Sequence, residues 1–264
     1  MKNIVVIGGG NMGFTYAEGI FNSQIANIQI IEKFEPRIEE IEAIKKMKVS
    51  SSYESIESAD IIFLAIKPQI APEVFKEIKT LINQNQVIIS VMAGTTIDTI
   101  QNGLGIHKVV RCMPNLPASI QLGMTTYVAS QEVSKEELIL SDKILNSTGK
   151  AFQVANEAMI DNTTGISGSG PAYVFYFMNA MVEKATEIGF NEAQAKELVA
   201  QTFKGAVALY ESNEISLDAW MDRVASKGGT TRAALDSFDS NDTHNLIKEG
   251  ITACINRAEE LGKM

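Results

Sequence analysis

The stretch IVVIGGGNMG, residues 4–13, decides the fold. Its four apolar residues predict a short buried strand, and Gly8, Gly10 and Gly13 follow as G-x-G-x-x-G before a helical pattern. In that context Gly8 permits a tight turn, Gly10 lets a pyrophosphate approach the backbone, and Gly13 lets helix and strand pack closely. The phosphates then bind the helix N-terminus, where free N–H groups favour anions. The alternative is a glycine-rich turn without a ligand.

The rest of the first half alternates short apolar runs with helical patterns. Strands are expected at 28–31, 61–66, 87–91, 108–111 and 125–128, and helices at 35–47, 71–82 and 134–147. The runs are continuously apolar, as strands covered on both faces are. Residues 1–155 are therefore predicted to form an α/β Rossmann domain with a doubly wound, mainly parallel sheet.

Residues 156–264 contain no comparable strand run. Helical periods occupy 157–166, 171–188, 191–212, 216–225, 230–239 and 242–262, which predicts an all-α second domain. Asn191, Ser216 and Asp242 are expected N-caps, and Gly189 is an expected helix stop. The stretch PAYVFYFMNAMV (171–182) is apolar nearly all round, so it must be buried on every side. We expect a subunit interface there, and the alternative is the core helix of a monomer.

Composition limits the functional classes. The chain has 264 residues, a net charge of −9 and no basic stripe, which excludes a nucleic-acid or anionic-membrane surface. With two cysteines and two histidines, the sequence argues against a disulfide framework and against a metal site. No run approaches the roughly 20 apolar residues of a membrane span. The expectation is a soluble, reduced, cytoplasmic protein without a metal.

Candidate cofactor contacts gather where strands end. Glu32 ends the second strand, and an acid there accepts from the adenosine ribose 2′-OH, which favours NADH. Lys33 follows, and a cation there favours a 2′-phosphate, so the residues leave NADH and NADPH open. The segments LAIKPQ (64–69) and VMAGTT (91–96) lie at the ends of the third and fourth strands, where the nicotinamide end is expected. Lys67 is read either as a ligand to ribose or phosphate or as a solvated loop lysine.

A second glycine cluster lies in SKGGTTRAALDSF, residues 226–238. Two glycines and two threonines precede an Ala/Leu helical pattern, although helix propensity disfavours both residue types. One capping residue would start a helix. Helix propensity alone does not explain why four small residues stand at this helix N-terminus.

With these pieces in order, the chain resembles the pyrroline-5-carboxylate reductases from end to end. The resemblance rests on GGGNMG (8–13), AIKP (65–68), MAGTTI (92–97), RCMPNLPASIQLGMT (111–125), GISGSGPAYVF (165–175) and SKGGTT (226–231). It implies reduction of the cyclic imine 1-pyrroline-5-carboxylate to L-proline with NADPH or NADH, the last step of proline biosynthesis. It also implies a helical dimerisation domain, 156–264, in a homodimer that often assembles into a decamer.

The resemblance also implies a site. It places the substrate carboxylate on backbone N–H groups of Gly228, Gly229 and Thr230, and the catalytic Thr231 hydroxyl against the ring nitrogen. Glu157 matches a substrate-binding position near that nitrogen, with a solvated helix acid as the alternative. The cofactor-binding set becomes Gly8, Gly10, Asn11, Met12, Gly13, Glu32, Lys33, Ser52, Ala65, Ile66, Lys67, Pro68, Met92 and Ala93.

The chain departs from the family pattern at three points. Lys227 stands where a proline is common, and Ser52 where an asparagine contacts the adenosine side. The Glu32-Lys33 pair replaces a common Ser- or Arg-containing turn. The two changes on the adenosine side bear on cofactor preference and leave the expected fold unchanged.

Three rival functions are considered. β-Hydroxyacid dehydrogenases share the two-domain plan but use a lysine on the long helix, and 171–182 has none, with Lys184 too far along. A catalytically silent nucleotide-binding homologue would not need Thr231. A reductase of another cyclic imine acid is compatible with the same residues.

Overall fold

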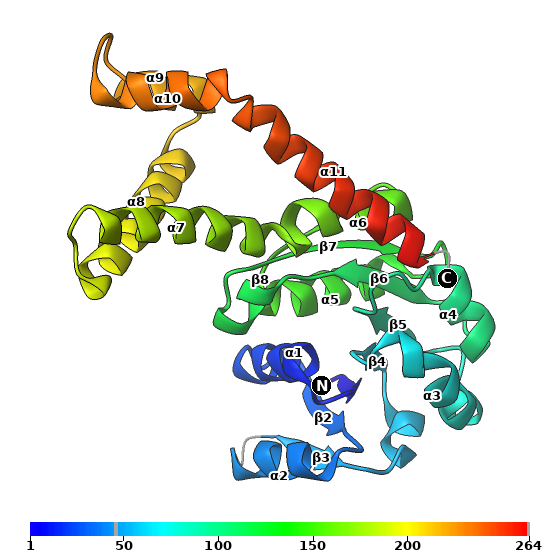
Figure 1. Ribbon diagram of the computed structural model, residues 1–264. Helices are drawn as coiled ribbons and strands as arrows, with labels where there is room; N and C mark the ends of the chain where they lie inside the picture. Colours follow the sequence, from blue (N-terminus) through cyan, green and yellow to red (C-terminus); the bar gives the residue numbers. More distant parts are fainter. Residues whose placement is uncertain (45–46, 263–264) are drawn as a thin grey trace. The chain divides into compact units, whose positions relative to one another are not determined.

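The computed structural model describes residues 1–44 and 47–262 (Figure 1). The expected helix 35–47 appears as α2, Glu35–Ala43. Residues 45–46 of that expectation lie outside the described residues. The chain divides into two compact units, Met1–Ser169 with Cys254–Met264, and Gly170–Ala253. The units divide after Ser169, and the domain boundary expected between residues 155 and 156 stays a prediction.

The first unit is built on one sheet with strand order β3-β2-β1-β4-β5-β6-β7-β8 among the described residues. The strands are β1 Asn3–Ile7, β2 Asn27–Ile31, β3 Lys48–Ser50, β4 Ile61–Leu64, β5 Val87–Ser90, β6 Val109–Met113, β7 Gly123–Ala129 and β8 Gly149–Gln153. Among the pairings of these described strands, only that of β6 with β7 is antiparallel. The predicted doubly wound, mainly parallel sheet is confirmed.

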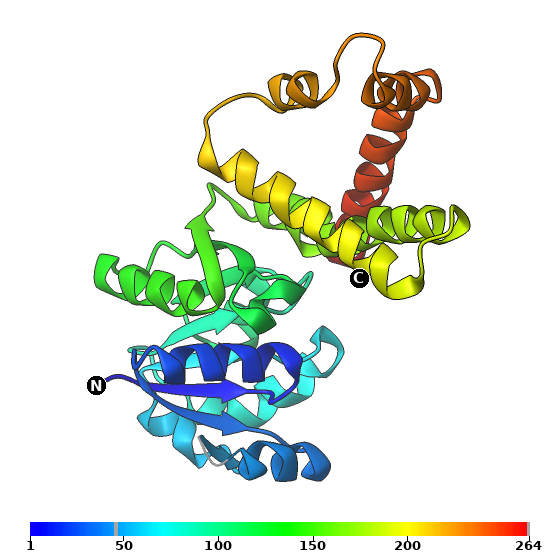
Figure 2. The same ribbon diagram turned by 90° about the vertical axis from the view of Figure 1, so that its left-hand side faces the viewer.

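Alternating strand residues divide into two cores, one on each face of the sheet. Ile4 and Val6 pack with helices α1 (Asn11–Asn22), α2 and α5 (Lys135–Leu145). Val5 and Ile7 pack with α3 (Ala71–Ile78), α4 (Ile97–Leu104) and α6 (Glu157–Thr163). Figure 2 shows α1 lying along one face. Burial on both faces explains why these strands are continuously apolar.

Two strands were not predicted from the sequence. The edge strand β3 has the sequence KVS, and β8, at the other edge, has GKAFQ. Each contains little apolar sequence, because an edge strand is covered less completely than a central one. Their position in the sheet depends on pairing with β2 and β7 rather than on a pattern of their own.

The second unit is entirely helical in its described residues. Its helices are α7 Gly170–Glu187, α8 Glu192–Ser212, α9 Leu217–Val224, α10 Thr230–Ser240 and the first part of α11 Thr243–Gly262. Asn191 forms a capping box with Gln194, and the Ser216 hydroxyl accepts from the Ala219 N–H, so two of the three predicted N-caps are confirmed. Asp242 precedes α11 with φ +56°, and its Oδ1 accepts from the side-chain amide of Asn245 at 2.7 Å. Gly189 has φ +107°, which ends α7 as expected.

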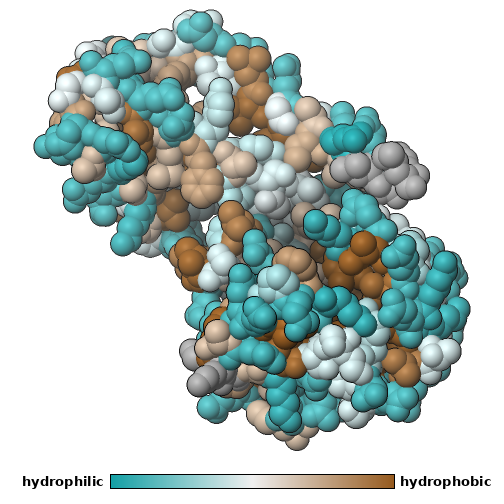
Figure 3. All heavy atoms as spheres, turned by 60° about the horizontal axis from the view of Figure 1, so that its bottom comes forward, coloured by the Kyte–Doolittle hydropathy of each residue, from teal (hydrophilic) through white to brown (hydrophobic). Residues whose placement is uncertain are grey.

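Helix α7 exposes its apolar residues in the single chain. None of its residues is buried, and the exposed fraction reaches 58% at Phe175 and 76% at Tyr176. Helix α8 exposes Val207, Leu209 and Tyr210 as well. Figure 3 draws hydrophobic residues in brown, and several of them lie at the surface. Exposed apolar surface of this kind marks an interaction site, which favours the predicted subunit interface over a monomer core.

The described residues supply no helix with the length and apolar character needed to cross a bilayer. They also contain no group of three or more His, Cys, Asp or Glu side chains placed to hold a metal ion. Cys112 and Cys254 are free.

Candidate functional site

The glycine turn between β1 and α1 has little room for side chains. Gly8 has φ +99°, and a Cβ there would lie 2.6 Å from the Ala65 carbonyl oxygen. A Cβ on Gly13 would overlap the carbonyl oxygen of Gly8. Gly10, in contrast, has no heavy atom within 4 Å of a Cβ position. Gly8 and Gly13 are therefore required by the packing of the turn itself, whereas Gly10 leaves open space in front of the helix.

The N-terminus of α1 is open to a ligand. Its N-cap is Gly10, which provides no side-chain cap. Gly10 and Asn11 are exposed and Met12 is half-buried. The first N–H groups of a helix lack intrahelical partners, and with the helix dipole they favour an anion. The turn therefore fits a dinucleotide pyrophosphate, by its free donors and by the missing Cβ at Gly10.

The adenosine side of this edge is shaped by Glu32. Its Oε2 accepts from the Gly9 N–H at 2.8 Å, and its Oε1 accepts from the N–H groups of Lys33 at 2.7 Å and Phe34 at 2.9 Å. Arg37 donates from Nε to the Gly9 carbonyl at 2.6 Å. The side chain of Glu32 is thereby fixed against the glycine turn. Arg37, which sequence reasoning missed, supports the same turn from α2.

Ser52 lies beyond β3, the strand beside β2. It is exposed, and its hydroxyl accepts from the Glu54 N–H at 3.3 Å. Near it, Lys33 Nζ lies 4.2 Å from the centroid of the Tyr53 ring and 3.9 Å from Glu77 Oε2. Burial, then the negative charges of Glu77 and Glu32, raise the pKa of Tyr53. Glu77 and Glu32 thus both lie near enough to Tyr53 to act on its hydroxyl group.

The predicted nicotinamide-side segments follow β4 and β5. The Ala65 N–H donates to Ile7 O, and the Val91 N–H to Leu64 O, so both segments continue the parallel strands at the same carboxyl edge as the glycine turn. Lys67 and Ala93 are exposed, whereas Met92 is 2% exposed and packs in the core. Because the Met92 side chain is buried, only the Met92 backbone is left to contact a cofactor.

A buried arginine connects β6 to α6. The Arg111 side chain is 3% exposed, with Nη1 2.9 Å from Glu157 Oε1 and Nη2 2.6 Å from Asp161 Oδ1. The same Glu157 oxygen accepts from the Ile97 N–H at 3.0 Å, at the start of α4. Glu157 is thus neither a solvated helix acid nor free of internal partners. Its role toward the substrate stays a prediction, and in the structure it links β6 to the starts of α4 and α6.

The motif that follows β6 anchors the SGSG segment. Asn115 donates from Nδ2 to the Ser167 carbonyl at 3.0 Å and accepts from the Met124 N–H at 2.9 Å. The segment Thr164–Gly168 is a π-helical turn after α6, and Cys254 Sγ lies 3.2 Å from Ser169 Oγ. These contacts, all within the first unit, hold the turn and α6 to the sheet.

The predicted substrate turn belongs to the second unit. Gly228 has φ +72°, and the Gly229 N–H donates to the Ser226 carbonyl at 2.9 Å. Helix α10 then starts at Thr230 with Gly229 as N-cap and no side-chain cap. Its backbone donors are therefore left for another acceptor. Thr231 is half-buried in this first turn.

Arg232 is a further residue that the sequence did not single out. Its Nη2 donates to Asp222 Oδ1 at 2.9 Å, which ties the start of α10 to α9. The two ends of the glycine turn are thus held together within this unit. No local sequence pattern signals this pair, since its members are separated by 10 positions.

Comparisons with known proteins match both halves of the chain. A family model described as pyrroline-5-carboxylate reductase dimerisation matches residues 157–261, and one described as NADP oxidoreductase, coenzyme F420-dependent, matches residues 3–94. The pyrroline-5-carboxylate reductase of Pseudomonas aeruginosa is 32% identical over 98% of this chain and 97% of its own length. This chain belongs to the pyrroline-5-carboxylate reductase family.

Solved structures of the pyrroline-5-carboxylate reductases agree with the fold. That of Coxiella burnetii has a TM-score of 0.91 and 31% identity, covering 98% of both chains. That of Plasmodium falciparum, with NADP bound, has a TM-score of 0.87 and 27% identity, covering 99% of this chain and 98% of its own. The rival dehydrogenase reading is not supported, and Lys184, in the last turn of α7, pairs with Glu187 at 2.8 Å.

Proposed function

We propose that this chain reduces 1-pyrroline-5-carboxylate to L-proline with NAD(P)H, the last step of proline biosynthesis. The carboxyl edge of the sheet binds the cofactor, and the start of α10 binds the substrate. When bound, the reduced nicotinamide supplies the hydride that reduces the C=N bond. The chain's own residues bind, orient and assist protonation.

The observation that carries the substrate assignment is the uncapped start of α10. The N–H groups of Gly228 and Thr230 stand at a helix start without a side-chain cap, whereas the Gly229 N–H already donates to the Ser226 carbonyl within the turn. The positive φ of Gly228 makes the tight turn possible. An anionic carboxylate is the ligand that such donors and the helix dipole favour. The imine acid carries this carboxylate on the carbon next to its ring nitrogen.

We assign Thr231 the role of orienting the ring nitrogen. A threonine hydroxyl is too weak an acid to protonate a free imine outright. Either the substrate that accepts the hydride is therefore the protonated iminium, or the hydroxyl relays a proton from water. In either case Thr231 aligns the ring for hydride transfer, which is a positioning contribution.

We also propose that the chain forms a homodimer through the exposed faces of α7 and α8, that dimers assemble into a decamer, and that the protein is cytoplasmic. Support comes from the match of residues 157–261 to a dimerisation model and from the apolar side chains of α7. Two chains that cover these faces remove apolar area from water.

The carboxylate assignment is tested with a truncated substrate. 1-Pyrroline, which has the same ring without the carboxylate, is expected to be reduced with kcat/KM lower by about 10²- to 10⁴-fold, because the donors of α10 are left without an acceptor. The comparison is a steady-state assay of both imines on one enzyme preparation. Values of kcat/KM within about threefold of each other would contradict the assignment.

A further inference from the structure

The cofactor edge contains a carboxylate where the backbone offers an anion site. Three N–H groups, those of Gly9, Lys33 and Phe34, converge on Glu32 at 2.7–2.9 Å. The group lies at the carboxyl end of β2, beside the glycine turn, where the Rossmann arrangement places the adenosine ribose. We infer that Glu32 makes this chain selective for NADH over NADPH. The inference rests on the proposed function, since it places the dinucleotide at this edge.

The hydrogen bonds of Glu32 leave room for a hydroxyl. An ionised carboxylate has about four lone-pair sites and only accepts hydrogen bonds. Gly9 uses one site on Oε2, and Lys33 and Phe34 use two on Oε1. The remaining site on Oε2 accepts the 2′-OH of the NADH ribose. The backbone contacts fix the carboxylate before the cofactor arrives, so little side-chain entropy is lost on binding.

The same contacts exclude a 2′-phosphate. Converging backbone N–H groups form an anion-binding concavity. In this chain its anion is the carboxylate of Glu32 itself. A phosphate on the ribose brings a second acceptor-only group against the first, so the two anions repel and neither gains the donors.

The nearby cations have other partners. Lys33 Nζ lies over the Tyr53 ring and near Glu77. Arg37 donates from Nε to the Gly9 carbonyl and from Nη1 to Glu40 Oε2 at 2.7 Å. Arg37 therefore supports the turn. Lys33, at the carboxyl end of β2, faces Glu77 at 3.9 Å, so that carboxylate competes with a 2′-phosphate for its charge.

The test measures equilibrium binding without the imine. Titration calorimetry of the full chain with NADH and NADPH, and with 5′-AMP and adenosine 2′,5′-bisphosphate as fragments, gives the ratio of dissociation constants. In each pair, the native chain is expected to bind the nucleotide without the 2′-phosphate at least about tenfold more tightly. The Glu32→Gln variant is expected to lose most of that preference, because the repulsion is removed.

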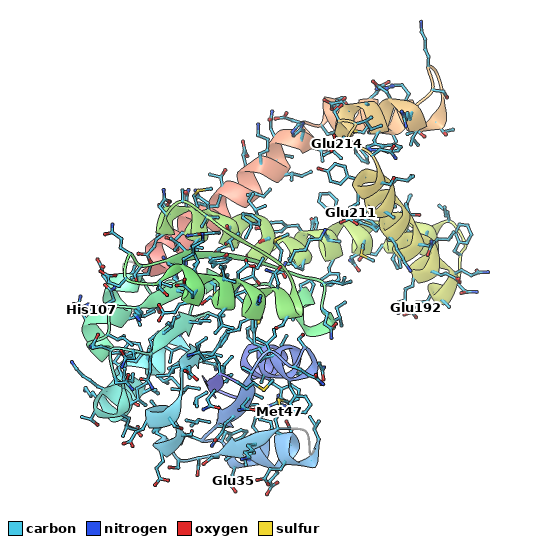
Figure 4. The ribbon with its side chains drawn as sticks, turned by 180° about the vertical axis from the view of Figure 1, so that it is seen from behind. Glu35, Met47, His107, Glu192, Glu211 and Glu214 are labelled. Carbon is cyan, nitrogen blue, oxygen red and sulfur yellow. The ribbon has the colours of Figure 1, made fainter. Side chains whose placement is uncertain are left out.

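The matched control is Glu35→Gln, which removes the same charge from the exposed first turn of α2 (Figure 4). We expect it to change the ratio by less than about twofold, since an exposed charge is screened. Tighter binding of NADPH by the native chain, or an unchanged ratio in Glu32→Gln, would overturn the inference alone. Binding of neither dinucleotide would overturn both it and the proposed function.

Discussion

Replacing Gly13 by alanine is expected to destabilise the first unit even before a nucleotide binds. The added Cβ overlaps the Gly8 carbonyl oxygen and lies 3.0 Å from the Ala65 Cβ. Backbone atoms cannot turn away as a flexible side chain does, so α1 must move off the sheet. Overpacking of this kind costs about 1–3 kcal/mol or more, which lowers Tm by several degrees. Thermal unfolding of the cofactor-free protein measures the change.

Gly10→Ala is the matched control, because the same atom is added in open space. Gly10 has φ −64° and no heavy atom within 4 Å of a Cβ, so the variant is expected to keep its Tm. Its dinucleotide affinity is expected to fall by about tenfold or more, because the Cβ lies where the pyrophosphate approaches. A native Tm in Gly13→Ala, or native affinity in Gly10→Ala, would refute the separate roles of the two glycines.

Thr231→Ala is expected to lower kcat/KM by about 10-fold to 10⁴-fold, the range of a group that assists proton transfer. Thr231 lies in the first turn of α10 and is half-buried. The loss should fall mainly on kcat, because the substrate carboxylate is held by backbone donors that the substitution leaves in place. Steady-state kinetics at saturating cofactor measures both constants.

Thr231→Ser separates the hydroxyl from the methyl group. We expect this variant to retain most of the native kcat/KM, and both variants to unfold close to the native Tm. Native activity in Thr231→Ala would refute the role proposed for the hydroxyl. A serine variant as slow as the alanine variant would show that the hydroxyl is not the group that matters.

The glycine turn and the central strands could be predicted because their requirements are local. Gly8 has the positive φ that a tight turn demands, and β1, β4 and β5 are buried on both faces, so pattern and structure agree. The edge strands β3 and β8 could not be found, because KVS and GKAFQ bury too little for a pattern. Their formation depends on partners elsewhere in the chain.

The partners of Glu157 could not be predicted for a similar reason. Arg111 reads as one basic residue in an apolar strand, and its two acids lie 46 and 50 positions away. Only the folded chain brings Glu157 to Arg111 and the start of α4. Local sequence also left Glu32 and Lys33 as opposing signals, because their order does not reveal which side chain turns toward the glycine loop.

The most direct test of the account is turnover of the imine itself. Purified protein is mixed with 1-pyrroline-5-carboxylate, and the loss of absorbance of NADH and NADPH is followed in parallel, with L-proline measured as the product. The account predicts rapid oxidation of the reduced cofactor, with equimolar formation of proline and a higher kcat/KM for NADH. No oxidation of either cofactor by protein that binds a dinucleotide would contradict it.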